Sequence, residues 1–286
     1  MRALQAGRPQ DAADPSHGIG SVGEPATWIR RYMALLSTAE LVVHLFGRLP
    51  GALVYALVSL LLLNHQLARD VVWGTNRVAG PRAVHDRHLL VPSPIYLVLS
   101  IVALTRMASL ATSDFSTTWF GGFAFASIPT ALALRRFSRL SGGSLPAWGK
   151  ASWRQALVAI VALPLALVGV LASHPRPTLD WWDLSWQFWA MLAMFALSGC
   201  LDEILYQGIV RPALGDAMGT SGAAGCAFLY ALTHADVELG VLVALVAANV
   251  VFGLAVQRTR MLVGACAGRV LLNVLIVFAL PYWLPH

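Results

Sequence analysis

The sequence has few charged residues and almost no lysine. Only 12% of its 286 residues are charged, 57% are hydrophobic and the mean hydropathy is +0.66. Such a chain has too little polar surface to coat a soluble globule of this size. Lys150 is the only lysine, and the net charge of +6 comes from arginines in short loops between apolar runs. This pattern indicates membrane orientation rather than nucleic-acid binding, so we expect a polytopic membrane protein.

Cysteines are also scarce, and their spacing argues against a thiol metal site. Cys200, Cys226 and Cys266 lie in apolar segments and form no Cys-x-x-Cys pair, which favours packing residues over metal ligands. Residues 1–29 are rich in Gly, Pro, Ala and Asp and have no apolar stretch after their early arginines. We expect them to form a flexible polar tail with no cleavable signal peptide.

Nine apolar runs are long enough, or nearly so, to cross a hydrocarbon core of about 30 Å as helices. They lie at about 32–47, 50–67, 92–111, 118–135, 153–173, 184–213, 221–235, 239–257 and 261–280. The first run either crosses the membrane or lies in the interface, because it contains Glu40 and His44. These two residues form either a second functional pair or, as we favour, ordinary polar contacts between helices. The predicted fold is all-α, a polytopic transmembrane bundle of eight or nine helices.

The arginine distribution predicts one orientation for almost every loop, with Arg48 as the main exception. The Arg-rich connections before run 32–47, after run 50–67 and between runs 118–135 and 153–173 are expected on the cytoplasmic side. The segments 112–118 and 281–286 have no basic residue except a terminal histidine and are expected outside. We therefore predict a multi-pass protein of the cell (inner) membrane with a cytoplasmic N-terminus.

Polar side chains from three predicted helices reach similar depths in this orientation. At 1.5 Å per residue, Asp202 lies about 18 Å above the inner end of its helix, with Glu203 beside it. His234 lies about 20 Å up the next helix, and Arg269 and Asn273 lie about 12 and 18 Å up the last. Because an ionised group at the centre of a span costs about 2.5–3.5 kcal/mol, we expect these groups to face a shared, partly hydrated cavity.

Each of these residues also has a plainer explanation when taken alone. Asp202 and Arg269 can form a structural ion pair that neutralises both charges. His234 can be an interfacial histidine at a helix end, and Asn273 can be an amide that hydrogen-bonds between helices. The sequence leaves these alternatives open.

Three short motifs carry the polar residues in a fixed order. They are DEILYQG with Asp202, Glu203, Gln207 and Gly208, YALTH with Tyr230 and His234, and RVLLN with Arg269 and Asn273. They resemble the Glu-Glu-x-x-x-Arg, Phe-x-x-x-His and His-x-x-x-Asn/Asp motifs of the CPBP intramembrane proteases, the family of the type II CAAX prenyl endopeptidases and bacteriocin-processing enzymes. The resemblance covers residues 184–280, with Asp, Gln, Tyr and Arg standing where the family has Glu, Arg, Phe and His.

The resemblance implies an intramembrane endopeptidase and suggests a role for each motif. In the family, the first acidic residue and the first histidine activate water, and the last polar pair stabilises the oxyanion. Carried over to this chain, Asp202 and His234 would activate water, and Arg269 and Asn273 would bind the oxyanion. A fixed guanidinium suits that second role because it supplies both positive charge and hydrogen-bond donors.

The other motif residues are expected to support this site. Glu203 points about 100° away from Asp202 around the helix and either orients the site or acts in place of Asp202. Glu203 and Gln207 share a helical face and are expected to hydrogen-bond each other, and Tyr230 lies in the supporting place of the second motif. Because the cation of Arg269 would repel Zn²⁺ and only one motif histidine remains, we favour a metal-free mechanism without a cofactor.

Two functions of different classes follow from these residues. The first is an endopeptidase acting on a membrane-associated protein or peptide, and the bacterial style of the composition favours a sorting tail, a secreted peptide or a regulatory membrane protein. The second is a non-catalytic relative that binds a peptide or membrane partner in the same cavity. The predicted regions are a tail at 1–29, N-terminal membrane helices at 30–183 and a catalytic core at 184–286.

Overall fold

The computed structural model describes residues 23–77, 95–111, 149, 152–173 and 186–284, and the elements within them are helices. The α-helices are α1 Gly23–Phe46, α2 Arg48–Arg77, α3 Ile95–Ala111, α5 Trp153–Ile160, α6 Ala162–Ser173, α7 Trp186–Glu203, α8 Arg211–Met218, α9 Gly222–Thr233, α10 Leu239–Thr259, α11 Val263–Val274 and α12 Leu280–Trp283. Two π-helical segments, η3 Ile204–Val210 and η5 Leu275–Ala279, and the 3-10 turn η4 Gly219–Ser221 join some of them. The predicted all-α class is confirmed for this part of the chain.

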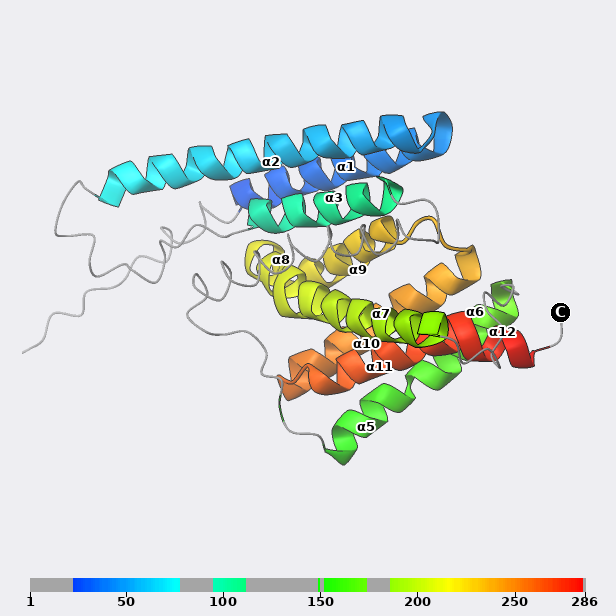
Figure 1. The fold of residues 1–286 in the computed structure, drawn as a ribbon. Helices are drawn as coiled ribbons and strands as arrows, with labels where there is room; N and C mark the ends of the chain where they lie inside the picture. Colours follow the sequence, from blue (N-terminus) through cyan, green and yellow to red (C-terminus); the bar gives the residue numbers. More distant parts are fainter. Residues whose placement is uncertain (1–22, 78–94, 112–148, 150–151, 174–185, 285–286) are drawn as a thin grey trace, which may run out of the picture.

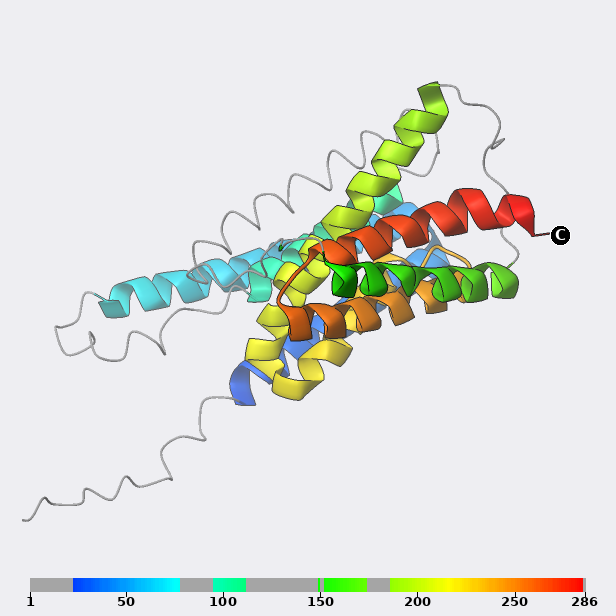
Figure 2. The ribbon, with the colours of Figure 1, turned by 90° about the horizontal axis from the view of Figure 1, so that it is seen from below.

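The helices form two packed groups with α8 and α9 between them (Figure 1). In the first group, α2 packs along both α1 and α3. In the second group, α10 packs on α6, and α11 packs on α5 and α7. Figure 2 shows that α7 crosses α11 obliquely, whereas α10 and α11 run in similar directions beside α5 and α6. The candidate site residues lie where α7, α9 and α11 come together.

A glycine makes the sharp turn between the first two helices. Gly47 separates α1 from α2 and has a φ of +95°, a backbone conformation that glycine adopts without steric cost. The chain can therefore reverse within one residue, and α2 returns along α1. Pro50 lies in the first turn of α2, where its missing N–H costs no helical hydrogen bond.

Side chains from α6 and α5 accept hydrogen bonds from backbone N–H groups in the first turns of α10 and α11. The first N–H groups of a helix have no partner within it, and here the backbone N–H of Val241 donates to Ser173 Oγ at 3.0 Å. The backbone N–H of Gly264 likewise donates to Gln155 Oε1 at 2.8 Å. These two bonds tie α10 and α11 to the helix pair beside them and fix the level at which α11 presents its polar residues.

The surface of the bundle supports a membrane location. Four stretches of described residues are long and apolar enough to cross a membrane, namely Arg48–Ala68, Trp153–Ser173, Phe188–Thr233 and Leu239–Thr259. Ile95–Met107 and Val263–Val277 are shorter apolar helices. Leucines on the outer face of α2, such as Leu53 and Leu60, are largely exposed, as expected for a surface in contact with lipid. The number of eight or nine spans stays a prediction, and run 118–135 lies outside the described residues.

The N-terminal part differs from the sequence prediction in one place and agrees with it in another. Helix α1 begins at Gly23, inside the segment expected to be a tail, and Ile29 is already fully buried. Glu40 does not pair with His44, which is exposed; instead its carboxylate accepts hydrogen bonds from Tyr55 and Arg106 on the neighbouring helices. The favoured interpretation, an ordinary polar contact between helices, therefore holds for Glu40. The alternative of a Glu40–His44 pair is wrong, because the buried face of α1 contains Glu40 but not His44.

Candidate active site

The two adjacent carboxylates end α7 and have different surroundings. Asp202 and Glu203 are the last residues of α7, and the π-helical segment η3 follows them directly. Such wide turns occur often at functional sites. The Glu203 side chain is fully buried, whereas that of Asp202 is 26% exposed. The structure therefore offers one buried carboxylate and one that is partly exposed.

Glu203 forms a buried ion pair with Arg269. Nε of Arg269 donates to Oε1 of Glu203 at 2.9 Å, and both side chains are fully buried. The two helices can approach because α7 has Gly199 at the crossing, where a Cβ would lie only 3.1 Å from Cγ of Arg269. The carboxylate partner of Arg269 is thus Glu203, not Asp202 as the ion-pair alternative assumed.

Three buried polar atoms around this pair have no hydrogen-bond partner within the described part of the chain. They are Oε2 of Glu203, Nη2 of Arg269 and the hydroxyl of Tyr230. The guanidinium of Arg269 lies over the Tyr230 ring at 4.7 Å, which places the three groups in one neighbourhood. Buried polar groups are normally hydrogen-bonded, so this cluster has capacity for a further polar partner.

His234 lies at the end of α9, and its ring is held from one side. It is the C-cap residue, directly after Thr233, as the helix-end alternative proposed. Its ring stacks on Tyr230 with centroids 4.2 Å apart, and Nδ1 lies 3.0 Å from the backbone carbonyl oxygen of Tyr230. A carbonyl oxygen only accepts hydrogen bonds. The geometry therefore assigns a hydrogen to Nδ1 and leaves Nε2 of the neutral ring with a free lone pair.

The free nitrogen of His234 faces Asp202. Nε2 lies 3.6 Å from Oδ2 of Asp202, and the two side chains are 23% and 26% exposed. This distance is too long for a direct hydrogen bond. Two acceptors at this separation, both open to solvent, form a place where one water molecule can contact both. The structure thus brings together the two residues that the motifs single out for water activation.

The hydroxyl groups of Tyr206 and Thr233 form a chain of hydrogen bonds to the Tyr230 carbonyl, which also contacts the His234 ring. The motifs gave these two residues no role. Thr233 Oγ1 donates to the Tyr230 carbonyl at 3.0 Å, and Tyr206 Oη lies 2.6 Å from Thr233 Oγ1. Because Thr233 has a single hydroxyl hydrogen, Tyr206 is the donor in that second bond. Both residues lie inside the quoted motifs, DEILYQG and YALTH, but hydroxyl contacts between separate helices have no signature in sequence spacing.

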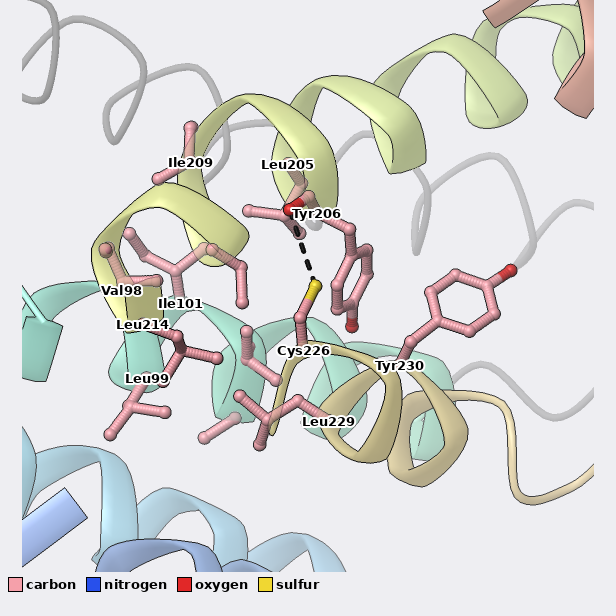
Figure 3. Close-up of a cluster of buried hydrophobic side chains, with 14 of the residues drawn as sticks. Val98, Leu99, Ile101, Leu205, Tyr206, Ile209, Leu214, Cys226, Leu229 and Tyr230 are labelled. Carbon is pink, nitrogen blue, oxygen red and sulfur yellow. Dashed lines mark hydrogen bonds between the residues drawn. The ribbon is translucent and has the colours of Figure 1, made fainter. Parts of the chain in front are cut away.

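The core beneath these residues is tightly packed. Tyr206 and Tyr230 meet edge to face with ring centroids 4.8 Å apart, a favourable aromatic geometry. Figure 3 shows both rings above Leu229, with the Cys226 thiol beside the Tyr206 ring. This thiol donates to the Tyr206 carbonyl oxygen at 3.6 Å. Cys226 is therefore a packing residue, as expected.

Gln207 does not bond to Glu203 as the helical spacing predicted. Its Nε2 donates to the backbone carbonyl of Asn249 at 3.0 Å, and its Oε1 accepts from Arg211 at 3.4 Å. The prediction assumed an α-helix, but these residues enter the wider i to i+5 turn of η3, which changes which side chains share a face. Gln207 therefore links η3 to α10 instead of supporting the carboxylates directly.

Asn273 lies one turn beyond Arg269 on α11 and is half-buried. Its side chain makes no hydrogen bond to another described residue. The structure thus places it on the helix that carries Arg269 but does not join it to Asp202 or His234. Its expected role at the oxyanion stays a prediction.

A shallow apolar depression of about 470 Å³ lies between α7 and α11. Its lining includes Cys200, Cys266 and Val270. The candidate site residues Asp202, His234 and Arg269 are not part of this lining.

No group of three or more His, Cys, Asp or Glu side chains that could hold a metal ion occurs among the residues that the structure describes. The position that resembles the second family histidine is occupied by Arg269, whose Nε is already bonded to Glu203. The absence of a cofactor stays a prediction.

Comparison with known proteins gives one match, and it covers all three motifs. Residues 184–275 match the family model described as Type II CAAX prenyl endopeptidase Rce1-like. No curated protein and no solved structure was found to match the chain. The match agrees with the resemblance seen in the motifs, and the apolar helices agree with a membrane protease. Residues 184–275 of this chain are therefore similar to the type II CAAX prenyl endopeptidase Rce1-like family, which is a protease family.

Proposed function

We propose that this protein is an intramembrane endopeptidase that hydrolyses a peptide bond in a membrane-associated protein or peptide. The observation that carries the proposal is the pair formed by Asp202 and His234, in which a free Nε2 lies 3.6 Å from a carboxylate oxygen and both groups are partly exposed. Next to this pair lies a fully buried ion pair with unused hydrogen-bonding capacity. The match of residues 184–275 to a protease family model supports a proteolytic role.

The proposed reaction needs a base, an oxyanion donor and an acid for the leaving amine. A water molecule held by Asp202 and His234 attacks the carbonyl carbon, and Nε2 of His234 takes one of its protons. The bond between carbon and nitrogen then breaks, and the same proton passes from Nε2 to the departing amine. Asp202 stabilises the imidazolium that exists between these steps.

The oxyanion formed in this reaction is assigned to the last motif. Nη2 of Arg269 is a donor without a partner in the described structure, and Asn273 lies one turn further along α11. A positioned charged donor is an effective stabiliser of developing negative charge. Glu203 holds the guanidinium in place through Nε.

The substrate is proposed to be apolar near the cut. The shallow depression between α7 and α11 is lined by apolar side chains and two cysteines, which suits an aliphatic segment of a membrane-associated peptide. We place the protein in the cell membrane as a multi-pass protein with a cytoplasmic N-terminus, because the arginine-rich loops favour that orientation.

The test compares peptide termini in cells that carry the native chain or His234→Ala at equal expression. New termini are identified by mass spectrometry of membrane and secreted peptides, and we expect at least one defined terminus to fall by about 10²- to 10⁴-fold in the variant. His44→Ala is the matched control, since His44 is exposed on α1. Identical termini in native and His234→Ala cells would instead favour the non-catalytic scaffold that binds a peptide partner.

A further inference from the structure

Arg106 connects the N-terminal helices to the turn that contains His234. It lies on α3 with only 1% of its side chain exposed. Its Nη2 and Nε donate to the two oxygens of Glu40 on α1 at 2.6 and 3.1 Å. Its Nη1 donates to Oδ1 of Asp236 at 2.9 Å. Asp236 is two residues after His234, in the turn between α9 and α10.

The Arg106–Glu40 pair is fixed in place by its surroundings. The Tyr55 hydroxyl on α2 donates to Oε2 of Glu40 at 2.8 Å, so residues from α1, α2 and α3 all contribute. Two parallel bonds between a guanidinium and a carboxylate are a strong and strictly oriented arrangement. Nη1 of Arg106 is therefore presented to Asp236 from a rigid base.

The turn transmits the position of Asp236 to His234. The backbone carbonyl of His234 accepts a hydrogen bond from Val237 N at 3.2 Å, which closes the turn around Asp236. The backbone N–H of His234 donates to Ala231 at 3.2 Å. A shift of Asp236 would therefore move the backbone of His234 and with it Nε2.

The bond to Asp236 is not needed to neutralise the arginine. Glu40 already supplies a buried negative charge in two-point contact, whereas the Asp236 side chain is 51% exposed. Ion pairs with such an exposed member contribute little to stability. The bond between Arg106 and Asp236 therefore acts mainly by fixing the position of Asp236.

We propose that Arg106 and Asp236 are positioning residues, which hold the turn at residues 234–238 so that Nε2 of His234 faces Asp202. The catalytic consequence rests on the proposed endopeptidase function. The positional consequence does not, because it concerns only where the imidazole lies. Both can be measured with the full chain.

The first measurement follows the rate at which diethylpyrocarbonate modifies His234 in the purified full-length protein in detergent, by mass spectrometry of the peptide. Asp236→Ala is expected to raise this rate by about threefold, because the turn opens locally. Asp236→Asn is expected to stay near the native rate, since its amide oxygen can still accept from Arg106. Glu238→Ala is the matched control, because Glu238 is an exposed acidic residue of the same turn that makes no side-chain cap hydrogen bond. Equal rates in all four proteins would overturn the proposal.

The second measurement uses the peptide whose terminus depends on His234. Asp236→Ala is expected to lower kcat by about 10- to 100-fold with little change in KM, because a displacement of about 1 Å at a catalytic group has effects of this size. In a His234→Ala background the same substitution should cause no further loss. A further loss there, or a large drop in the thermal unfolding midpoint of Asp236→Ala, would show a general structural role and contradict the proposal.

These two measurements separate the two claims. If His234→Ala leaves every peptide terminus unchanged, the endopeptidase function fails, and the modification rates still decide whether the turn is held by Arg106. If cleavage depends on His234 but Asp236→Ala changes neither the modification rate nor kcat, only the positioning role fails.

Discussion

The described residues contain two buried arginine–glutamate pairs, one in each group of helices, and the pairs differ in how many of their polar atoms have hydrogen-bond partners. In the pair between Arg106 and Glu40, both carboxylate oxygens and three guanidinium nitrogens have close charged partners. In the pair between Arg269 and Glu203, Oε2 of the glutamate and Nη2 of the arginine have no partner among the described residues. Both arginines are almost completely buried.

This difference separates a structural pair from one that can take part in chemistry. A buried polar group without a partner costs about 1–3 kcal/mol, so a structure that keeps two of them beside a histidine forgoes stability at that place. The Arg106–Glu40 pair joins α1, α2 and α3, and each of its carboxylate oxygens and guanidinium nitrogens has a hydrogen-bond partner. The second pair leaves a donor and an acceptor without a partner among the described residues, near Tyr230, on whose ring His234 stacks. In the proposed function, the donor stabilises the oxyanion.

The largest effect is expected when the satisfied pair is broken. Arg106→Met leaves Glu40 buried without its charge partner, which typically costs about 3–5 kcal/mol. The loss is measured as a lower free energy of unfolding in detergent, with Arg30→Met on the exposed face of α1 as the control. The double variant Arg106→Met with Glu40→Leu should recover part of the loss, and no recovery would show that Arg106 stabilises the fold by packing rather than by charge.

A smaller loss of stability is expected at the second pair. Glu203→Gln removes the charge but keeps an amide oxygen that can still accept from Nε of Arg269. The loss is therefore expected at about 1.5–3 kcal/mol, the contribution of a hydrogen bond to a charged group, and not at the full cost of removing a partner. Activity should fall as well, because the guanidinium of Arg269 is held less firmly. Unfolding and cleavage of the His234-dependent peptide are measured together. A stability loss equal to that of Arg106→Met, with full activity, would remove the distinction between the two pairs.

The close approach of α7 and α11 gives a third prediction. Gly199→Ala adds a Cβ 3.1 Å from both Cγ of Arg269 and the backbone N of Val270, and such overpacking costs about 1–3 kcal/mol. Gly215→Ala is the opposite control, since no atom lies within 4 Å of a Cβ there. In a helix this substitution should stabilise by about 0.5–1 kcal/mol. Unfolding measurements that show the same sign for both variants would contradict the packing.

The smallest effect is expected when the Tyr206 hydroxyl is removed. Tyr206→Phe removes the donor to Thr233 Oγ1, and a single neutral hydrogen bond contributes about 0.5–1.5 kcal/mol. The variant should remain folded and lose only part of its activity, as measured on the same peptide. A complete loss of cleavage would mean that Tyr206 has a direct catalytic role.

The sequence predicted that Asp202 and His234 lie close together, but it did not predict the contacts of the residues around them. The order and spacing of the three motifs pointed to Asp202 and His234 as neighbours, and the structure brings them together. The partner of Arg269 was not predictable, because the choice between two adjacent carboxylates depends on how α7 crosses α11 at Gly199. Gln207 was assigned to the wrong partner because nothing in DEILYQG indicates a π-helical turn.

The N-terminal helices could be predicted as elements but not as part of the site. Glu40 and Arg106 are 66 residues apart, and Arg106 and Asp236 are 130 residues apart. No local spacing connects them, since their contact depends on how the first three helices pack against α9. An isolated buried charge does indicate that a partner exists, and Arg106 within the apolar run 92–111 was such a signal.

The most direct test of the account is the rate of peptide cleavage by Asp202→Ala, His234→Ala and the double variant, with the purified protein in lipid vesicles. If the two residues activate one water molecule together, each single variant should lose about 10²- to 10⁴-fold. The double variant should then be no slower than the slower single variant, because residues that act as a unit are not additive. Losses that multiply in the double variant, or single variants with native rates, would contradict the claim that Asp202 and His234 form one catalytic pair.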